Sequence, residues 1–279
     1  MYMKEWFCIL GLAVLLHPLW TGESITGNDS DYLEVCEQAA TKQWYFDHFR
    51  SLYDYTQIIE IRCGDLFADF LKNNASQEIF RKIHEFEKLD RIGNPLTLDY
   101  YEGLGNFSGA TLRYITIADQ IKKLFLLPND AKIVELGAGF GGQCYILSHL
   151  QSFSDYYILD LPEVEPLIEK VVNTLEIKNV TYSSKENRVL NNDVDLFISN
   201  YAFSECDRQT QLEYFEKVIK NSKRGYIIYN QIAQSVFGLD SLSAIEFFSL
   251  LQKNNMNPKL YNEPVRTAPD NVLIIWDNA

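Results

Sequence analysis

Apolar positions follow two different rhythms along this chain. From Tyr32 to about Asp90 they recur every three or four residues with few glycines between them, which predicts helices. From Ala131 onward, short apolar runs alternate with segments of helical spacing. We expect strands at 132–136, 155–160, 178–182, 194–199 and 224–230, and helices at 142–151, 163–175, 208–222 and 242–254.

The alternation of strands and helices predicts a mainly parallel α/β sheet, because consecutive parallel strands need a crossover that is usually a helix. A further helix is expected over 108–125, where apolar residues fall on one face. Two breakers precede it, Gly93-Asn94-Pro95 and Gly103-Leu104-Gly105-Asn106. The expected organisation is a leader and linker over 1–30, a helical N-terminal region over 31–130 and an α/β domain over 131–279.

Signals at the ends of elements sharpen this outline. Ser243-Ala244-Ile245-Glu246 has the form of a capping box, and Asp207 is a candidate N-cap for the helix 208–222. The apolar runs 259–261 and 272–276 are expected to close the sheet as a pair of strands.

The predicted strand 132–136 runs directly into a glycine-rich turn, Gly137-Ala138-Gly139-Phe140-Gly141-Gly142. Glycine tolerates positive φ and lets the backbone approach a ligand closely. The helix expected next would direct the free N–H groups of its first turn at that ligand. A strand, a glycine turn and a helix in this order are typical of nucleotide-type cofactor sites, but the spacing G-x-G-x-x-G alone does not say which cofactor binds.

Two acids narrow the choice of cofactor. Glu135 stands two residues before Gly137, and Asp160 ends the next predicted strand, about 20 residues past the glycines. At that offset a carboxylate can accept hydrogen bonds from both ribose hydroxyls. An acid before the glycines suits a cofactor with a positively charged or amino-bearing group, and it suits a pyrophosphate poorly because like charges repel.

Several segments resemble those of known methyltransferases. The segment 135–141 resembles motif I of the class I S-adenosylmethionine-dependent methyltransferases, and 194–205 is similar to their motif IV region. Asp160-Leu161-Pro162-Glu163-Val164 resembles the D-L-P-x-V segment of small-molecule O-methyltransferases. The phrases that resemble the sugar O-methyltransferase family are Ser199-Asn200-Tyr201-Ala202-Phe203-Ser204-Glu205, Gly93-Asn94-Pro95 and Thr111-Leu112-Arg113-Tyr114.

The superfamily resemblance spans about residues 131–279, and the narrower one spans about 40–279. The resemblance to the superfamily implies a Rossmann-like sheet with an antiparallel last strand and S-adenosyl-L-methionine as the cofactor. The narrower resemblance implies methyl transfer to a hydroxyl of a small molecule, a sugar or glycan precursor. The expected cofactor-binding residues are Glu135, Gly137, Ala138, Gly139, Gly141, Asp160, Leu161, Asn200 and Arg113.

A sugar hydroxyl is a weak nucleophile at neutral pH, so a general base is expected. Glu205 is the candidate, because it follows the strand 194–199 at the carboxyl edge of the sheet, where ligands bind. The alternative is a solvated acid, or one that helps to start the helix 208–222. Arg113 is the candidate partner of the cofactor carboxylate, with a surface salt bridge as the alternative. The aromatic residues that could stack on a sugar or simply pack in the core are Tyr100, Tyr101, Phe107 and Tyr201.

Other features exclude several classes of function. The net charge is −13 and no Lys/Arg cluster occurs, which argues against a nucleic-acid substrate. The five scattered cysteines include no C-x-x-C, so neither a disulfide framework nor a zinc site is predicted. No metal is expected, because no H-x-x-H or acidic cluster occurs. The histidines, expected to be structural or exposed, are His17, His48, His84 and His149.

An apolar run at 6–16 follows Lys4 near the N-terminus. It is too short for a standard membrane span and has the length of a signal-peptide core. Three interpretations stay open: a cleaved signal, an uncleaved membrane tether, or leader sequence from a misplaced start codon. Because S-adenosylmethionine is a cytosolic cofactor, we expect a cytoplasmic catalytic domain with a small-molecule or saccharide acceptor, and membrane association only through an uncleaved tether.

Two other functions fit part of the pattern. An NAD-dependent oxidoreductase would explain G-x-G-x-x-G but neither Glu135 nor the polar loop after 194–199; saturable binding of NADH would support it. A non-enzymatic, membrane-tethered protein with a methyltransferase fold would explain the leader and the lack of an obvious base. Failure to bind the cofactor would support that function, since function lies in the site and not in the fold.

Overall fold

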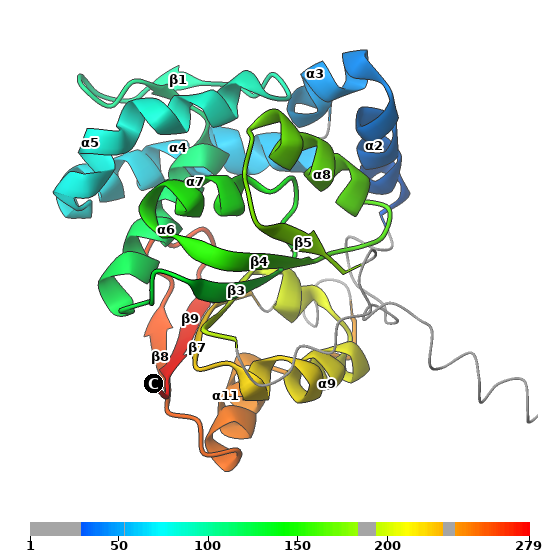
Figure 1. The fold of residues 1–279 in the computed structure, drawn as a ribbon, viewed down its shortest axis with the longest axis vertical. Helices are drawn as coiled ribbons and strands as arrows, with labels where there is room; N and C mark the ends of the chain where they lie inside the picture. Colours follow the sequence, from blue (N-terminus) through cyan, green and yellow to red (C-terminus); the bar gives the residue numbers. More distant parts are fainter. Residues whose placement is uncertain (1–28, 53, 184–193, 231–237) are drawn as a thin grey trace, which may run out of the picture.

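The computed structural model describes residues 29–52, 54–183, 194–230 and 238–279. The expectations for residues 1–28 lie outside the described residues. Across the described ranges, no helix is both long enough and apolar enough to cross a membrane. The ribbon in Figure 1 shows a sheet with helices on either side.

A seven-stranded sheet forms the centre of the molecule. Its strands, in spatial order, are β5 (Val180–Tyr182), β4 (Phe153–Leu159), β3 (Ala131–Leu136), β6 (Leu196–Asn200), β7 (Arg224–Tyr229), β9 (Val272–Asp277) and β8 (Pro258–Asn262). Neighbours from β5 to β7 pair in parallel, whereas β9 runs antiparallel to both β7 and β8. The expected α/β fold and its antiparallel last strand are therefore confirmed.

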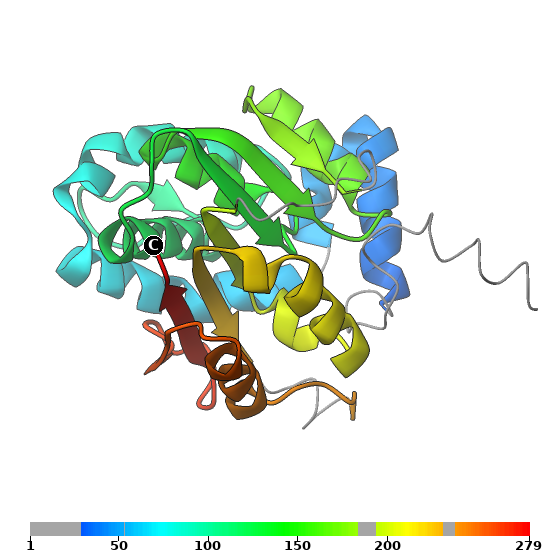
Figure 2. The same ribbon diagram turned by 60° about the horizontal axis from the view of Figure 1, so that its bottom comes forward.

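Adjacent side chains of β3 enter different layers of the core. Ile133 joins the layer of α6, α7 and α8, and Val134 joins the layer of α9 and α11. Successive side chains of a strand point to opposite faces, so a strand with apolar residues at consecutive positions, such as Ile133 and Val134, needs helices on both sides. Figures 1 and 2 show α9 and α11 on the opposite side of the sheet from α7 and α8. These helices are α6 (Gly109–Leu124), α7 (Gly142–Leu150), α8 (Glu165–Thr174), α9 (Arg208–Lys217) and α11 (Ala244–Lys253).

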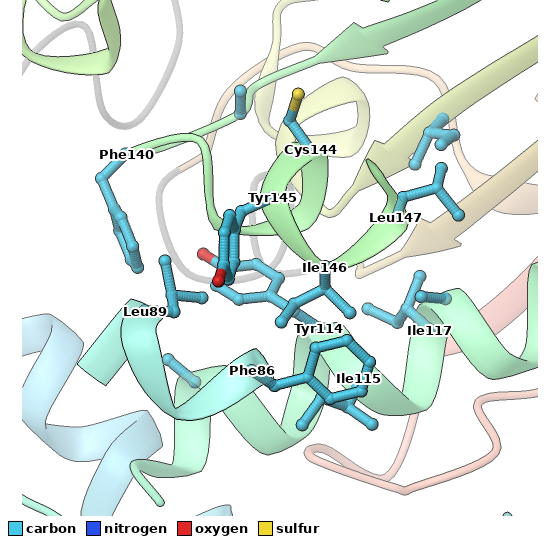
Figure 3. Packing of buried hydrophobic residues seen from close by; sticks show 14 of the residues in the cluster. Phe86, Leu89, Tyr114, Ile115, Ile117, Phe140, Cys144, Tyr145, Ile146 and Leu147 are labelled. Atoms are coloured by element: carbon cyan, nitrogen blue, oxygen red, sulfur yellow. The ribbon is translucent and has the colours of Figure 1, made fainter. Parts of the chain in front are cut away.

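The N-terminal helices pack against α6, α7 and α8. They are α2 (Ser30–Thr41), α3 (Gln43–Leu52), α4 (Asp54–Asn74), α5 (Gln77–Phe86) and the 3₁₀ turn η2 (Glu87–Arg91), followed by the short strands β1 (Leu98–Asp99) and β2 (Asn106–Phe107). Helices α4 and α5 lie against α6, α5 also lies against α7, and α2 lies against α8. Figure 3 shows Phe86 and Leu89 beside Tyr145 and Ile146 of α7 in one continuous core. The helical region therefore covers the side of the sheet on which α7 lies, the helix that follows the glycine turn.

A buried ion pair fastens these helices to the start of α6. Arg50, which is 1% exposed, donates to Asp90 at 2.9 Å and to the Ser108 hydroxyl at 2.6 Å. The Asp90 carboxylate in turn accepts from the backbone N–H of Ser108 and from the Thr111 hydroxyl. Gly93 adopts φ +77°, and a Cβ there would lie 2.8 Å from the Arg50 side chain. The breaker at 93–95 thus lets the chain pass close to this pair.

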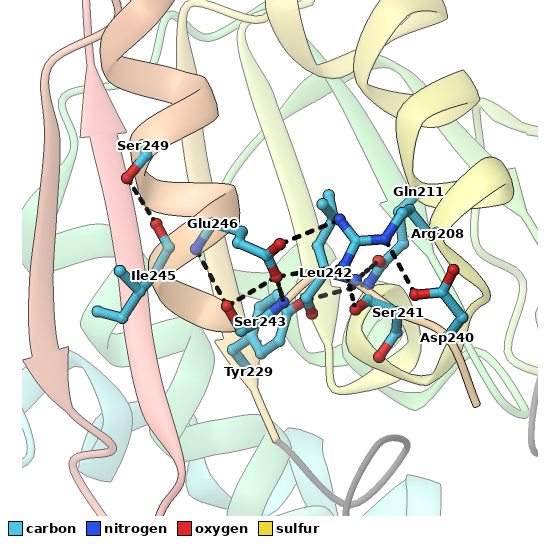
Figure 4. Close-up of polar contacts among 10 residues, drawn as sticks. All are labelled: Arg208, Gln211, Tyr229, Asp240, Ser241, Leu242, Ser243, Ile245, Glu246 and Ser249. Carbon is cyan, nitrogen blue, oxygen red and sulfur yellow. Dashed lines mark hydrogen bonds and ion pairs between the residues drawn. The ribbon is translucent and has the colours of Figure 1, made fainter. Parts of the chain in front are cut away.

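On the other face, Arg208 of α9 ties the chain before α11 in place (Figure 4). Its guanidinium donates to Asp240 at 3.0 Å and to Glu246 at 3.1 Å. Glu246 also completes the capping box with Ser243, and Asp207 caps α9 by accepting from the Thr210 N–H at 2.7 Å. Both capping predictions are confirmed.

The largest departure from the expected boundaries is at the end of α9. A single helix was expected over 208–222, but α9 ends at Lys217 and a short 3₁₀ turn, η4 (Ile219–Asn221), follows. Val218 leaves the helix with φ −131°, and both Val218 and Ile219 are fully buried. The chain turns here because these two consecutive residues pack into the core ahead of β7.

Candidate functional site

Three glycines with left-handed backbone form the turn between β3 and α7. Gly137, Gly139 and Gly141 have φ of +76°, +60° and +89°. A Cβ on Gly137 would lie 2.1 Å from that of Ala202, whereas a Cβ on Gly139 would meet no atom of the described residues within 4 Å. Gly141 is the N-cap of α7 and supplies no side-chain cap. The turn is therefore closed by the loop after β6 on one side and open above Gly139, next to N–H groups of the first helical turn.

Asp160 lies directly beside this turn. It follows β4, and its carboxylate accepts hydrogen bonds from the backbone N–H of Gly139 at 3.2 Å and of Leu161 at 2.8 Å. Burial raises the pKa of Asp160 to about 7, although hydrogen bonds from the backbone, including that of Gly139, lower it. The spacing along the sequence thus brings the acid of β4 to the glycine turn, as expected.

Glu135 lies within the core. It is 1% exposed, and its carboxylate accepts a hydrogen bond from the Tyr156 hydroxyl at 2.7 Å. Burial raises its pKa to about 8, against the lowering effect of that hydrogen bond. We expected this acid to face an amino-bearing group of the cofactor. Glu135 lies on β3 and is hydrogen-bonded to Tyr156 of β4, so direct contact with a ligand stays a prediction.

Arg113 of α6 presents a guanidinium that has no carboxylate partner among the residues that the structure describes. The guanidinium carbon lies 5.1 Å from the ring centroid of Tyr114 and 5.7 Å from that of Tyr201. Its Nε is buried without a hydrogen-bond partner, and none of the ion pairs among the described residues includes it. The acids whose charges act on it lie farther away. A partly buried cation without an adjacent anion is suited to bind an anionic group of a ligand.

The loop after β6 is fastened to the end of β3. The Ser199 hydroxyl donates to the Leu136 carbonyl at 3.0 Å and accepts from the N–H of Phe203 at 3.0 Å. Asn200 places its Nδ2 3.5 Å from Gln143 of α7, and its Oδ1 is buried without a partner. Asn200 therefore retains an acceptor beside the glycine turn, whereas Ser199 is occupied by the backbone.

Glu205 lies where β6 and β7 end, on the 3₁₀ turn η3 (Ala202–Glu205). Its carboxylate accepts a hydrogen bond from Asn230 Nδ2 at 2.8 Å, and Asn230 follows β7 directly. Burial raises the pKa of Glu205, while the hydrogen bond from Asn230 and the charge of Arg113 lower it. Because Asp207 caps α9, Glu205 is not the cap of that helix.

Sequence reasoning missed a second polar cluster beside the site. Glu263, in the loop after β8, accepts a hydrogen bond from the Tyr201 hydroxyl, although the two residues stand 62 positions apart. Its carboxylate also accepts from the Thr267 N–H and from Asn271 Nδ2, each at 3.0 Å. No motif marks Glu263, and only the pairing of β9 with β7 brings its loop to the loop after β6.

The N-terminal helices reach the glycine turn through Phe140. Its ring centroid lies 5.7 Å from that of Phe49 and 5.8 Å from that of Tyr114, and the Arg50 guanidinium carbon lies 4.6 Å from it. From α2, Tyr32 interacts electrostatically with Asp160. The helical region thus contributes one wall of the candidate site.

The remaining candidates pack elsewhere. Phe107 is fully buried in the core, and the Tyr100 hydroxyl packs against Gly64. The His149 ring meets the Tyr145 ring edge-on, with centroids 4.5 Å apart, on the side of α7 that faces Phe86. Among the residues that the structure describes, no group of three or more His, Cys, Asp and Glu side chains is arranged to hold a metal ion.

No family model matches this chain, and no curated protein matches it. Solved structures with similar folds include a SAM-dependent methyltransferase from Aquifex aeolicus, at 18% identity and a TM-score of 0.46, covering 70% of this chain and 96% of that one. Geranyl diphosphate C-methyltransferase from Streptomyces coelicolor A3(2) has 13% identity and a TM-score of 0.45, covering 61% of this chain and 82% of that one. M. capricolum TrmK, solved with S-adenosyl-homocysteine, has 16% identity and a TM-score of 0.39, covering 58% and 67%. Identities this low say nothing of the reaction.

Proposed function

We propose that this protein is an S-adenosylmethionine-dependent methyltransferase that moves a methyl group to a hydroxyl of a small molecule, a sugar or glycan precursor. The observation that carries the proposal is the pairing of two features around one turn. The Asp160 carboxylate accepts from the N–H of Gly139 at the glycine turn, and the Arg113 guanidinium lies over the Tyr201 ring with no carboxylate partner among the described residues. Asp160 can accept hydrogen bonds from ribose hydroxyls, and Arg113 can donate to a carboxylate. S-adenosylmethionine carries both of these groups.

The residues present fit this cofactor. The space above Gly139 is free where a Cβ would otherwise stand, so the ligand can approach the backbone closely. The Asp160 carboxylate at the turn, when ionised, suits a nearby cationic sulfonium, whereas a dinucleotide would bring two pyrophosphate charges towards it. When bound, S-adenosylmethionine supplies an activated methyl group. The protein then has to hold donor and acceptor in line, which can remove roughly 7–11 kcal/mol of the barrier.

Glu205 is the proposed general base. Its carboxylate is partly buried at the carboxyl ends of β6 and β7, and burial raises its pKa towards the range useful at neutral pH. Asn230 donates to one carboxylate oxygen, and no other described residue donates to the second oxygen, which can accept the proton of an acceptor hydroxyl. A base so placed contributes about 10²–10⁴-fold to the rate.

A small hydroxylated acceptor agrees with the charge of the chain. The net charge of −13 and the absence of a Lys/Arg cluster argue against a polyanionic acceptor such as RNA. The sugar assignment rests on the resemblance of 199–205, 93–95 and 111–114 to sugar O-methyltransferases.

Methyl-labelled S-adenosylmethionine tests the proposal. The full chain is incubated with the labelled cofactor and a panel of free sugars, uronic acids and nucleotide sugars, and label in stable O-methyl ethers is measured. We expect label in at least one class of sugar, lost in Asp160→Ala. Label confined to protein or RNA in a whole extract, with none in small molecules, would refute the acceptor class.

A further inference from the structure

We propose that Glu263 is a positioning residue for the cofactor carboxylate: through the Tyr201 ring it holds the Arg113 guanidinium in place, with the guanidinium donors free for that carboxylate. The inference rests on the proposed function and deepens it. It brings a loop at the edge of the sheet, between β8 and β9, into the cofactor site.

The Glu263 carboxylate is fixed from two sides. Glu263 is 3% exposed, and it accepts from the Thr267 N–H at 3.0 Å, from the Thr267 hydroxyl at 2.9 Å and from Asn271 Nδ2 at 3.0 Å. These donors belong to the β8–β9 connection itself. The Tyr201 hydroxyl, which also donates to Glu263, comes from the loop after β6. This last hydrogen bond joins the sheet edge to the site.

The backbone of Tyr201 is held in a conformation that residues other than glycine rarely adopt. Its φ is +75°, and its N–H donates to the Ile228 carbonyl at 2.9 Å. Strained residues of this kind persist only where the surroundings over-determine them, and they cluster at functional sites. With the backbone tied to β7 and the hydroxyl tied to Glu263, the direction of the ring is set at both ends.

The Tyr201 ring is one of two aromatic faces that hold Arg113. The guanidinium carbon lies 5.7 Å from this ring and 5.1 Å from that of Tyr114, within the range of cation–π attraction. Within the described part of the chain, its hydrogen bond to a side chain is a long one, 3.5 Å, to the Tyr114 hydroxyl. Arg113 is thus placed chiefly by ring faces, with most of its donors unused.

This arrangement suits an arginine that must bind a ligand. A direct salt bridge would occupy the donors of the guanidinium, whereas a ring face attracts its charge and leaves the planar fork free. A phenol that donates to a carboxylate becomes more electron-rich, so the hydrogen bond to Glu263 strengthens the attraction of the ring for the cation. The charge of Glu263 also acts on Arg113 directly, although the two form no ion pair.

A comparison of two ligands tests the proposal. S-adenosylhomocysteine carries the amino-acid carboxylate, and 5′-methylthioadenosine carries the same nucleoside and sulfur without it. Calorimetry on the full chain gives both Kd values for the wild type, Glu263→Gln, Tyr201→Phe and Arg113→Met. Glu246→Gln, a change of the same kind at the start of α11, is the matched control.

We expect Glu263→Gln and Tyr201→Phe to raise the Kd of S-adenosylhomocysteine about 3–10-fold, the range of a partly buried cation–π contact. The Kd of 5′-methylthioadenosine should stay within about twofold. If Glu263→Gln disturbs the loop, Tyr201→Phe still reports on the ring. Equal weakening of both ligands in both variants, or no change in either, overturns the proposal. Failure of the wild type to bind S-adenosylhomocysteine refutes the proposed function as well.

Discussion

The carboxylate of Asp160 accepts a hydrogen bond from the backbone N–H of Gly139 at 3.2 Å. This contact joins the end of β4 to the centre of the glycine turn, at the one glycine of the three whose added Cβ would meet no atom of the described residues within 4 Å. The acid that would receive the ribose and the backbone that would approach the cofactor are therefore held together before any ligand arrives.

Binding of S-adenosylhomocysteine should strengthen as the pH rises from about 6 to 8. Burial raises the pKa of Asp160 to about 7, so much of it is protonated below neutrality. Ribose hydroxyls donate to the ionised form, so binding favours ionisation and releases a proton. Calorimetry in two buffers of different ionisation enthalpy measures that release, which Asp160→Asn should abolish. A wild type that releases no proton would contradict this role of Asp160.

The free protein should lose stability as the pH rises. The folded-state pKa of Glu135 is raised from 4.5 to about 8, so between these values the folded state binds more protons than the unfolded state. The free energy of unfolding therefore falls with increasing pH in that window. In Glu135→Gln, whose amide can still accept from Tyr156, we expect a gain of about 2–4 kcal/mol at pH 8 relative to the wild type, from the size of the shift. Denaturant unfolding at pH 5 and pH 8 measures the difference; an equal loss in both proteins would argue against a buried, protonated Glu135.

Glu205→Gln should lower kcat by about 10²–10⁴-fold while S-adenosylhomocysteine still binds with its normal Kd. The reason is that the amide keeps the contact with Asn230 but cannot take a proton. Steady-state kinetics and calorimetry on the same preparation separate the two effects. Near-normal turnover in the variant would remove Glu205 from the mechanism.

Replacing the glycines of the turn by alanine should separate effects on stability from effects on cofactor affinity. Gly139→Ala should fold, with a cost of about 1–2 kcal/mol for left-handed backbone, and should lose cofactor affinity because its methyl group fills the space above the turn. Gly137→Ala should be less stable by about a further 1–3 kcal/mol, because its Cβ would meet that of Ala202 at 2.1 Å.

Gly103→Ala is the control for strain alone, since Gly103 has φ +91° and open space around it, in the turn before β2. It should bind the cofactor normally. Thermal unfolding and titration of all three variants check the pattern, and full affinity in Gly139→Ala would place the ligand elsewhere.

Local patterns were enough to predict the sheet and the turn. The strand ending at Leu136, the glycines after it and the acid that ends β4 are neighbours in sequence or follow a fixed crossover length, so their contact could be anticipated. The caps at Asp207 and Ser243 were visible for the same reason, because a cap bonds to the backbone two or three residues on.

Contacts across the fold were not predictable. The hydrogen bond between Tyr201 and Glu263 depends on how the last hairpin pairs with β7, and a lone acid after a short strand gives no sign of it. The burial of Glu135 depends on a hydroxyl from β4 that reaches across the sheet. Sequence alone could place this acid before the glycines but could not say that it turns inward.

The measurement that tests the central claim most directly is a calorimetric titration of the full chain with S-adenosylhomocysteine, with NAD as the competing ligand. We predict micromolar binding of S-adenosylhomocysteine, no binding of NAD, and loss of the former in Asp160→Ala. Binding of NAD alone, or of neither ligand, would contradict the account.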